Sequence, residues 1–469
     1  MVLYIIRTAF RASSNPSLET SLRMAAILNV PCVCVAVVED STCLAWPPTD
    51  RSAAFKLEAL SELQPLLLAR GAALWTHVQR DGSRAAVEMS LAAKASLVVT
   101  DEHFGIEPHA AATARVAKTG TPLWLCDTTC TVPSRMLTNQ ALVGGNAGFL
   151  RASASLRAER LSDGWFPPPA PPPTQKPPDA PAWAVDLSGG DAAVDVILAE
   201  PSRRDATVPR VKHTKGGPSA AASRWSRYVS GGGLRSYAAQ RNNPLAADGR
   251  GASRMSAYVN LGMIDPYVMA RDATAAKADK YLSEFAGFRE SAHLWCMLHP
   301  GGYKDATVAV PTWARGQMRK YADGANEAST PSLSALERGE TGDAYWDDCQ
   351  RSLVAAGELH NNVRMAWGKA IPAWHAALLP RGEQPSPSAS VRLQAALNLL
   401  IRLNDRFALD GGSPPSYGGL LWCLGWRDRP GQDGCPTHRP TSVMASKIKP
   451  GDLLRKAMAR QGKLLFKDA

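Results

Sequence analysis

Residues 357–374 read GELHNNVRMAWGKAIPAW and bring amide, cationic and indole side chains together in a segment whose composition predicts one helix. Ala, Leu, Met and Lys favour helix, and no proline or internal glycine interrupts the first half. Asn361 and Arg364 are three residues apart and are therefore neighbours on the helix surface. Trp367 and Trp374 are seven apart, which places them on one face at about 10 Å along the axis. A core helix with an arginine paired elsewhere would give the same pattern.

Four further segments stand in a fixed order around this one. They read LRSYAAQRNNP (234–244), SRMSAYVNLGM (253–263), YLSEFAGFRE (281–290) and LNDRFALDGGSPPSYGGLLW (403–422). Together with HNNVRM (360–365), they resemble motifs of the photolyase/cryptochrome family: the entry to its FAD domain, its phosphate-binding segment, its active-site helix and its flavin-contacting motif. The last segment is similar to the class II photolyases in particular, so the chain is identified as closest to class II enzymes.

The resemblance implies two domains, an N-terminal α/β domain that carries the antenna chromophore and a C-terminal all-α domain that binds FAD. Alternating strand and helix patterns over residues 1–135 also predict a doubly wound parallel sheet of the Rossmann-like kind. Neither G-x-G-x-x-G nor a Walker A sequence occurs, which argues against an ordinary dinucleotide or ATP site. Strands are expected at 2–6, 30–38, 73–78, 96–100 and 122–126, and helices at 15–28, 51–70, 86–95 and 108–119.

Residues 136–224 are predicted to be an interdomain linker. Its proline-rich part, WFPPPAPPPTQKPPDAP (165–181), is expected to be extended, and an SH3 or WW ligand is the alternative. From 225 to 469 helical patterns dominate, with a long helix at 393–409 and a loop at 383–390 that is longer than the class II pattern. The basic tail, 446–467, fits either DNA contact or a solvated end.

The charge of the chain points to a polyanionic partner. Its 469 residues carry 53 Lys and Arg against 42 Asp and Glu, a net charge of +11, which favours nucleic acid, although a basic surface without function is the alternative. The resemblance implies ultraviolet-damaged DNA. We expect a monomer. We also expect no membrane segment, because no apolar run reaches the length that a bilayer requires.

The cysteines and the N-terminus bear on location. Nine cysteines, an odd number without a CxxC pair, predict a reducing compartment. The first residues, VLYII after Met1, are typical of a strand rather than a signal peptide. We therefore expect an intracellular protein, in the nucleus, chloroplast or mitochondrion of a eukaryote or in the cytoplasm of a bacterium.

The resemblance assigns a set of cofactor-binding residues. Arg364 and Asp410 match the family's ion pair beside the flavin, and a buried arginine requires such a carboxylate partner. Asn404 matches the class II asparagine that faces flavin N5, whereas Asn361 and Asn362 stand where class II commonly has Gly and Phe. Capping and core packing are the alternative for the hydroxyl residues. The predicted FAD-binding residues are Tyr237, Ser253, Met255, Ser256, Asn361, Arg364, Asn404 and Asp410.

A second set matches the lesion site. Glu284 would hydrogen-bond the pyrimidine carbonyls and assist proton movement, but the alignment leaves Glu290 as its rival. Phe288 stands where the family has an aromatic residue or an arginine. The predicted catalytic residues are Glu284, Met365, Asn404 and Trp422, and the predicted DNA-binding residues are Arg254 and Arg289.

Trp346, Trp367 and Trp374 fit the spacing of the class II tryptophan chain, which carries electrons between surface and flavin. Ordinary aromatic packing is the alternative. The implied function is light-driven splitting of cyclobutane pyrimidine dimers by an electron from photoexcited reduced FAD, with a deazaflavin or folate as antenna chromophore. The alternatives are a cryptochrome-like receptor, a photolyase-like flavoprotein without repair activity, and a nucleic-acid-binding module without redox chemistry.

Overall fold

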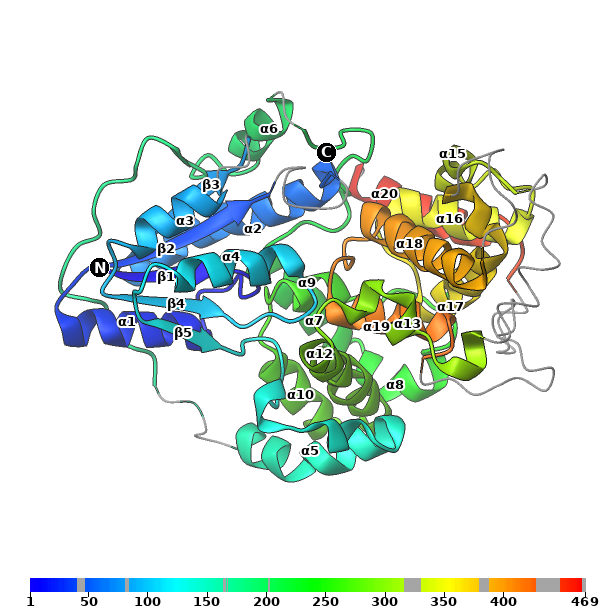
Figure 1. The fold of residues 1–469 in the computed structure, drawn as a ribbon, viewed down its shortest axis with the longest axis horizontal. Helices are drawn as coiled ribbons and strands as arrows, with labels where there is room; N and C mark the ends of the chain where they lie inside the picture. Colours follow the sequence, from blue (N-terminus) through cyan, green and yellow to red (C-terminus); the bar gives the residue numbers. More distant parts are fainter. Residues whose placement is uncertain are drawn as a thin grey trace.

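The computed structural model describes residues 1–39, 47–80, 84–162, 166, 168–200, 203–315, 330–378, 388–426 and 448–465. An α/β domain, mostly blue in Figure 1, lies beside a helical domain that is mostly green to red. This arrangement confirms the predicted two-domain fold class.

One six-stranded sheet forms the centre of the N-terminal domain, in the order β5-β4-β1-β2-β3-β6. Its first five strands are parallel and lie where the sequence predicts them, whereas the short edge strand β6 runs antiparallel to β3 and was not predicted. β1, β2 and β4 are buried at every position, which explains their uninterrupted apolar sequences. The bounds are β1 Val2–Ile6, β2 Cys32–Val38, β3 Ala72–Val78, β4 Leu97–Asp101, β5 Leu123–Cys126 and β6 Ala184–Val185.

Helices cover both faces of this sheet. Alternate residues of β1 point to opposite faces, so that Tyr4 packs in the same core as Leu18 and Leu60, and Leu3 packs in the same core as Leu91. α1 and α2 therefore cover one face, and α3 and α4 cover the other, as the predicted doubly wound sheet requires. The bounds are α1 Pro16–Leu28, α2 Asp50–Ala69, α3 Arg84–Ala92 and α4 Glu107–Ala117.

The predicted linker contains regular structure that sequence reasoning missed. Helix α5, Gly145–Leu161, packs against α10, Pro266–Ala275, in the helical domain (Figure 1). It was missed because its sequence, rich in Ala, Ser and Arg, buries few apolar side chains. Part of the proline-rich segment lies against α1 and the end of α2: Pro172 and Pro173 lie beside Gly71, and Ala170 N donates to Glu19 Oε2 at 2.6 Å. α6 Asp191–Ala199 and α7 Pro218–Ser230 complete this region.

Beyond residue 225 the described chain is helical, as predicted. Its C-terminal part has its own core, which includes Trp346, Trp367, Leu400 and Leu420. A seven-residue π-helix, η3, continues directly into α12. The bounds of the larger elements are α8 Gly233–Gln240, α9 Ser256–Asn260, η3 Ser283–Arg289, α12 Glu290–Leu298, α16 Ala344–Ala356, α17 Asn361–Ala370, η6 Ile371–Leu378, α18 Ala389–Phe407, α19 Pro414–Cys423 and α20 Asp452–Leu465.

The single helix predicted over 357–374 is wrong. Gly357 ends α16 in the left-handed region at φ 67°, and His360 caps the next helix by accepting from Asn362 N at 3.2 Å. α17 ends at Ala370, and a 3₁₀ segment follows in which Trp374 departs from helical geometry at φ −112°. A C-capping glycine and Pro372 therefore divide the run into three pieces.

Arg51, near the start of α2, connects the two domains. Its guanidinium donates to the carbonyl oxygens of Phe407 and Val354, both at 2.6 Å. Burial lowers the pKa of Arg51 to about 10, which leaves it charged at neutral pH. None of the described helices has the length and apolar character needed to cross a bilayer.

Candidate functional site

A cavity of about 650 Å³ in the helical domain collects most of the predicted site residues. Its volume lies in the range of small-molecule and cofactor sites. The predicted residues that line it are Tyr237, Ser253, Arg254, Met255, Ser256, Glu284, Phe288, Arg289, Asn361, Asn362, Arg364, Met365, Asp410 and Trp422. The predicted residues outside its lining are Glu290, Trp346, Trp367, Trp374 and Asn404.

Arg364 and Asp410 form the ion pair expected from the sequence. Arg364 Nη2 lies 2.8 Å from Asp410 Oδ1 and 3.0 Å from Oδ2. Burial opposes the charge of Arg364, but Asp410 more than offsets this effect, so its pKa is raised above the usual value. Asn260 Nδ2 donates to the Asp410 carbonyl at 3.0 Å, which fixes the loop after α18. The pair therefore places a permanent positive charge at the cavity wall.

Asn404, the residue that the resemblance places at flavin N5, is not among the residues that line the cavity. Its Nδ2 donates to Asp405 Oδ1 at 2.8 Å and to Ser416 Oγ at 3.0 Å, and the residue is buried. Ser416, whose hydroxyl accepts this hydrogen bond, does line the cavity. Desolvation raises the pKa of Asp405 to about 6. The register of α18 turns Asn404 toward α19, and a direct role at the cofactor stays a prediction.

The π-helix η3 presents three predicted residues to the cavity. Its i→i+5 hydrogen bonds bring residues four and five apart to one side, so Glu284, Phe288 and Arg289 all line the wall. Glu284 Oε1 lies 2.7 Å from Lys280 Nζ and 2.9 Å from Arg241 Nη2. Sequence reasoning missed Arg241, although it lies in the matched motif at 234–244.

Glu290, the alternative to Glu284 as the site carboxylate, is buried and hydrogen-bonded to Thr131. Its carboxylate accepts from Thr131 N and from Thr131 Oγ1, each at 2.8 Å. Burial raises the pKa of Glu290. Since Glu290 ties α12 to the segment after β5 and does not line the cavity, the geometry favours Glu284 as the site carboxylate.

An aromatic and apolar wall faces these polar groups. The Phe288 and Trp422 rings meet edge to face at 5.3 Å, and Met365 and Trp422 also line the cavity. Arg289 Nη1 donates to Thr129 O at 2.7 Å, while its Nε and Nη2 are buried without a hydrogen-bond partner. This part of the cavity suits a flat ligand that carries hydrogen-bond acceptors.

The three tryptophans form a continuous series of ring contacts, and their order in space differs from their order in the sequence. Trp346 lies 6.2 Å from Trp367 with nearly parallel rings and 4.8 Å from Trp374 at 84°. Trp367 Nε1 donates to Gln350 Oε1 at 2.9 Å. Trp346 is therefore the middle member, and Arg364 on the cavity wall lies one turn from Trp367 on α17.

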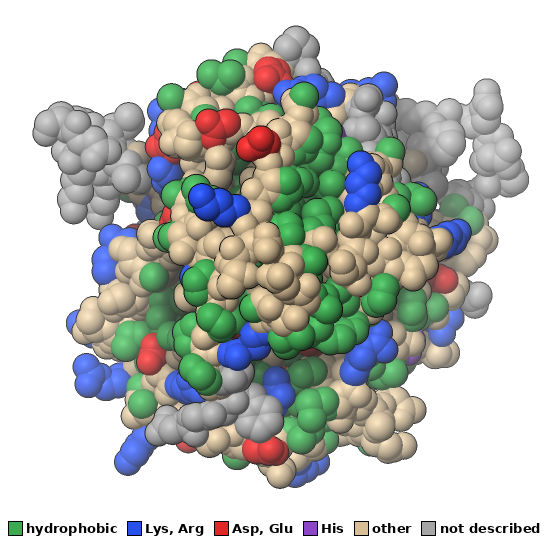
Figure 2. Space-filling view, turned by 90° about the vertical axis from the view of Figure 1, so that its left-hand side faces the viewer, with side chains coloured by type: hydrophobic (Ala, Val, Ile, Leu, Met, Phe, Trp, Pro, Cys, Tyr) green, Lys and Arg blue, Asp and Glu red, His purple; other side chains and the backbone are tan. Residues whose placement is uncertain are grey.

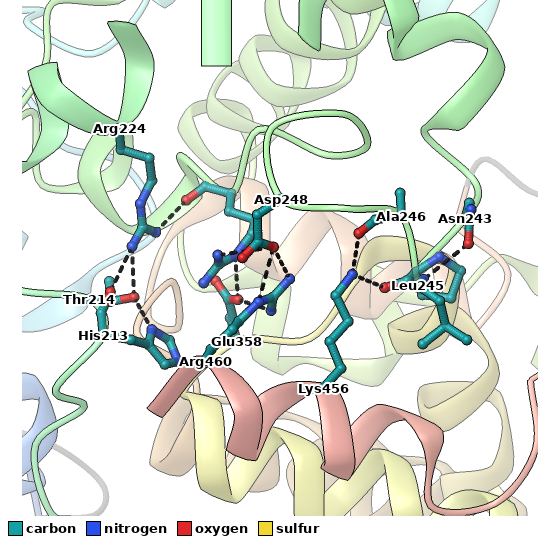
Figure 3. A network of polar contacts seen from close by, with 12 residues as sticks. His213, Thr214, Arg224, Asn243, Leu245, Ala246, Asp248, Glu358, Lys456 and Arg460 are labelled. Atoms are coloured by element: carbon teal, nitrogen blue, oxygen red, sulfur yellow. Dashed lines mark hydrogen bonds and ion pairs between the residues drawn. The ribbon is translucent and has the colours of Figure 1, made fainter. Parts of the chain in front are cut away.

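The predicted DNA ligand Arg254 lies within the cavity wall. Its Nε donates to Glu358 Oε1 at 2.5 Å, and its backbone is left-handed at φ 59°. Two cations of the predicted basic tail, Lys456 and Arg460 of α20, also line the cavity. Figure 3 shows both within the polar network that contains Glu358 and Asp248. Sequence reasoning missed this placement and Glu358, although Leu453, Lys456, Ala457 and Arg460 follow helical spacing.

Unpartnered polar atoms around the cavity indicate what it holds. Buried nitrogens without a protein hydrogen-bond partner include Arg254 Nη2, Arg289 Nε and Nη2, Arg364 Nε and His360 Nε2. Leaving such donors unsatisfied is costly, and native sites usually supply a ligand or water for them. The described residues therefore fit a large ligand with several anionic or acceptor groups.

Comparison with known proteins gives partial sequence matches. The chain is 29% identical over 216 residues to the deoxyribodipyrimidine photo-lyase of Methanothermobacter thermautotrophicus. The matched residues are 46% of this chain and 44% of that protein. The chain is 28% identical over 209 residues to the Arabidopsis thaliana protein of that name, which covers 42% and 38%. The chain thus matches less than half the length of these relatives. No protein-family model matches it.

Solved structures share the fold over nearly the whole chain. A class III photolyase from Agrobacterium tumefaciens superposes with a TM-score of 0.62 at 18% identity, covering 100% of this chain and 90% of that one. An archaeal photolyase from Sulfolobus tokodaii, solved with two FAD molecules, gives 0.63 at 13% identity, covering 99% and 94%. The Synechocystis cryptochrome gives 0.62 at 13% identity, covering 91% and 82%.

Proposed function

We propose that this chain, which belongs to the photolyase/cryptochrome family, is an FAD-dependent enzyme that uses light to split cyclobutane pyrimidine dimers in DNA. The observation that carries the proposal is the shared cavity, because residues assigned separately to the cofactor and to the lesion line the same cavity. The relatives named deoxyribodipyrimidine photo-lyase and the neighbour solved with FAD support it.

Bound, reduced FAD would supply the electron that opens the dimer when light excites it. Arg364, held by Asp410, would place a positive charge beside the flavin ring and favour its anionic form. Ser253, Ser256 and Tyr237 would donate hydrogen bonds to the cofactor. Because burial raises the pKa of Tyr237 to about 12, its hydroxyl keeps its proton and remains a donor.

The lesion half of the cavity would bind the dimer through its shape and its acceptors. Arg241 and Lys280 hold the Glu284 carboxylate at the wall, where it would hydrogen-bond the pyrimidine ring. Arg289 offers two unpartnered donors for a carbonyl or phosphate oxygen. Met365 and Trp422 would exclude water and pack against the pyrimidine faces.

A cryptochrome-like receptor that binds FAD without repair is the second candidate. One observation favours it: Glu284 is already ion-paired with Arg241 and Lys280. A lesion must therefore compete with these two cations for the Glu284 carboxylate. Asn361 and Asn362, which depart from the class II pattern, line the same cavity.

A flavin-detected titration tests the shared cavity. The flavin released from the purified protein is identified, and the absorbance of the bound flavin is then followed while a thymine-dimer oligonucleotide or its undamaged counterpart is added. We expect FAD, and a spectral change with the damaged strand alone. No flavin would refute the proposal, and FAD without a lesion-specific response would favour the receptor.

A further inference from the structure

The C-terminal helix α20 is docked through both of its faces. Leu453 and Ala457 are buried, and the helix packs against α16. Asp348 of α16 accepts from Leu453 N at 3.1 Å and from Leu454 N at 3.0 Å, which caps the first turn of α20. Its position beside the cavity is therefore set by burial and by a cap.

The opposite side of α20 holds the loop at 243–254. Lys456 Nζ donates to the carbonyl oxygens of Pro244, at 3.0 Å, and Ala246. Arg460 Nη2 donates to Asp248 Oδ1 at 2.8 Å (Figure 3). This loop contains Ser253 and lines the cavity, so Lys456 and Arg460, which line the cavity themselves, also hold this part of its wall.

The same helix also reaches Arg254 through one carboxylate. Glu358 Oε1 accepts from Arg460 Nη1 at 2.8 Å and from Arg254 Nε at 2.5 Å. Arg224 Nη1 donates to the Arg254 carbonyl at 3.2 Å. A left-handed backbone at a non-glycine residue is unfavourable and persists where its surroundings impose it. Arg254 is thus held so that its buried Nη2 remains without a partner.

This cluster carries excess positive charge. Its cations are Arg224, Arg254, Lys456 and Arg460, and its carboxylates are Asp248 and Glu358, which leaves two positive charges uncompensated. Two neighbouring histidines add none at neutral pH, because burial lowers the pKa of His213 and of His360 to about 4. Burial and the nearby Arg460 lower the pKa of Lys456 to about 8. A bound dianion would relieve this repulsion.

We propose that α20 completes the phosphate side of the cofactor cavity: Arg254 Nη2 binds the diphosphate of FAD, and Lys456 and Arg460 are positioning residues that hold the loop and Glu358 for it. This inference rests on the proposed FAD function. The diphosphate, with two negative charges, matches the uncompensated charge of the cluster, and Ser253 and Ser256 lie on the same wall. Arg254 thereby becomes a cofactor ligand rather than a DNA ligand.

The test separates the diphosphate from the flavin ring. Protein stripped of flavin is titrated with FAD and with riboflavin, which lacks phosphate, in the wild type and in Lys456→Met and Arg460→Gln. Each substitution is expected to weaken FAD about tenfold or more, as loss of a charge-assisted hydrogen bond implies, and to leave riboflavin unchanged. Arg460→Lys should recover part of the FAD affinity.

Arg455→Gln is the matched control, because this arginine of α20 is exposed and pairs with Asp452 away from the cavity. It should bind both flavins as the wild type does. An equal loss for FAD and riboflavin, or no loss in either variant while wild-type protein binds FAD, would overturn the inference and leave the proposed function intact. Wild-type protein that binds neither flavin would refute the proposed function itself. Thermal unfolding of each flavin-free variant identifies any variant that has failed to fold. In that case the FAD affinity of Arg460→Lys decides between the inference and its rejection.

Discussion

At the scale of single residues, the cavity depends on the ion pair of Arg364 and Asp410. Arg364→Ala should destabilise the protein by about 3–5 kcal/mol, because truncation leaves a largely buried carboxylate without its cation, and it should lower flavin occupancy. The flavin-to-protein absorbance ratio and thermal unfolding measure both effects. Arg338→Ala, which removes an ion pair with Glu340 in which both side chains are more than half exposed, is the control and should change little. Normal occupancy and stability in Arg364→Ala would contradict the assignment.

Glu284 and Glu290 have separable roles. Glu284→Gln should lower the yield of dimer splitting with normal stability, since an amide keeps the shape but cannot exchange a proton. The loss should fall below the about 10²–10⁴-fold of general acid–base catalysis, because the excited electron drives the reaction. Glu290→Gln should leave splitting unchanged and alter stability through the contact with Thr131. Single-turnover repair and unfolding of both variants decide, and a repair loss confined to Glu290→Gln would reverse the roles.

At the scale of elements, the break after α17 places Trp346 between the other two tryptophans. Trp346→Phe should therefore block photoreduction of the oxidised flavin as completely as Trp367→Phe, because phenylalanine is far harder to oxidise than indole. Flavin absorbance under illumination with an external reductant measures the rate. Trp295→Phe is the control, because this indole stacks on His299 and is not one of the three tryptophans. The flavin of this variant should be photoreduced at the wild-type rate. Full-rate reduction in Trp346→Phe would show another electron path.

Elements that bury one continuous apolar pattern could be predicted from the sequence, and those that depend on distant partners could not. The parallel strands are apolar throughout because both faces are covered. The order of the tryptophans depends on the turn that Gly357 begins and on the 3₁₀ segment that holds Trp374. Likewise, only tertiary contacts distinguish Ser416 from Asn404 at the wall or bring α20 to Arg254.

At the scale of the whole molecule, the net charge of +11 favours a polyanionic partner such as DNA. Figure 2, viewed from the side of the N-terminal domain, shows hydrophobic side chains gathered over that face with Lys and Arg scattered around them. We therefore expect DNA to bind at the helical domain, around the mouth of the cavity, where Lys280 is exposed at its edge.

Affinity for ultraviolet-damaged DNA should fall as the salt concentration rises. On a duplex, the logarithm of the binding constant should fall with the logarithm of the salt concentration, with a slope of about −0.9 per phosphate contact. If Lys280 contacts a phosphate, Lys280→Gln should reduce that slope by about one contact. Lys118→Gln, which changes an exposed lysine at the end of α4, is the control and should leave the slope unchanged. Equal slopes in all three proteins would place the DNA elsewhere.

The measurement that tests the central claim most directly is repair itself. Protein carrying fully reduced FAD is mixed with an oligonucleotide that contains one thymine dimer, illuminated with blue light, and assayed for restored thymines against a dark sample. The account predicts light-dependent restoration by the wild type and a reduced yield with Glu284→Gln. No restoration by wild-type protein whose flavin is fully reduced would contradict the repair function and favour the cryptochrome-like receptor that binds FAD without repair.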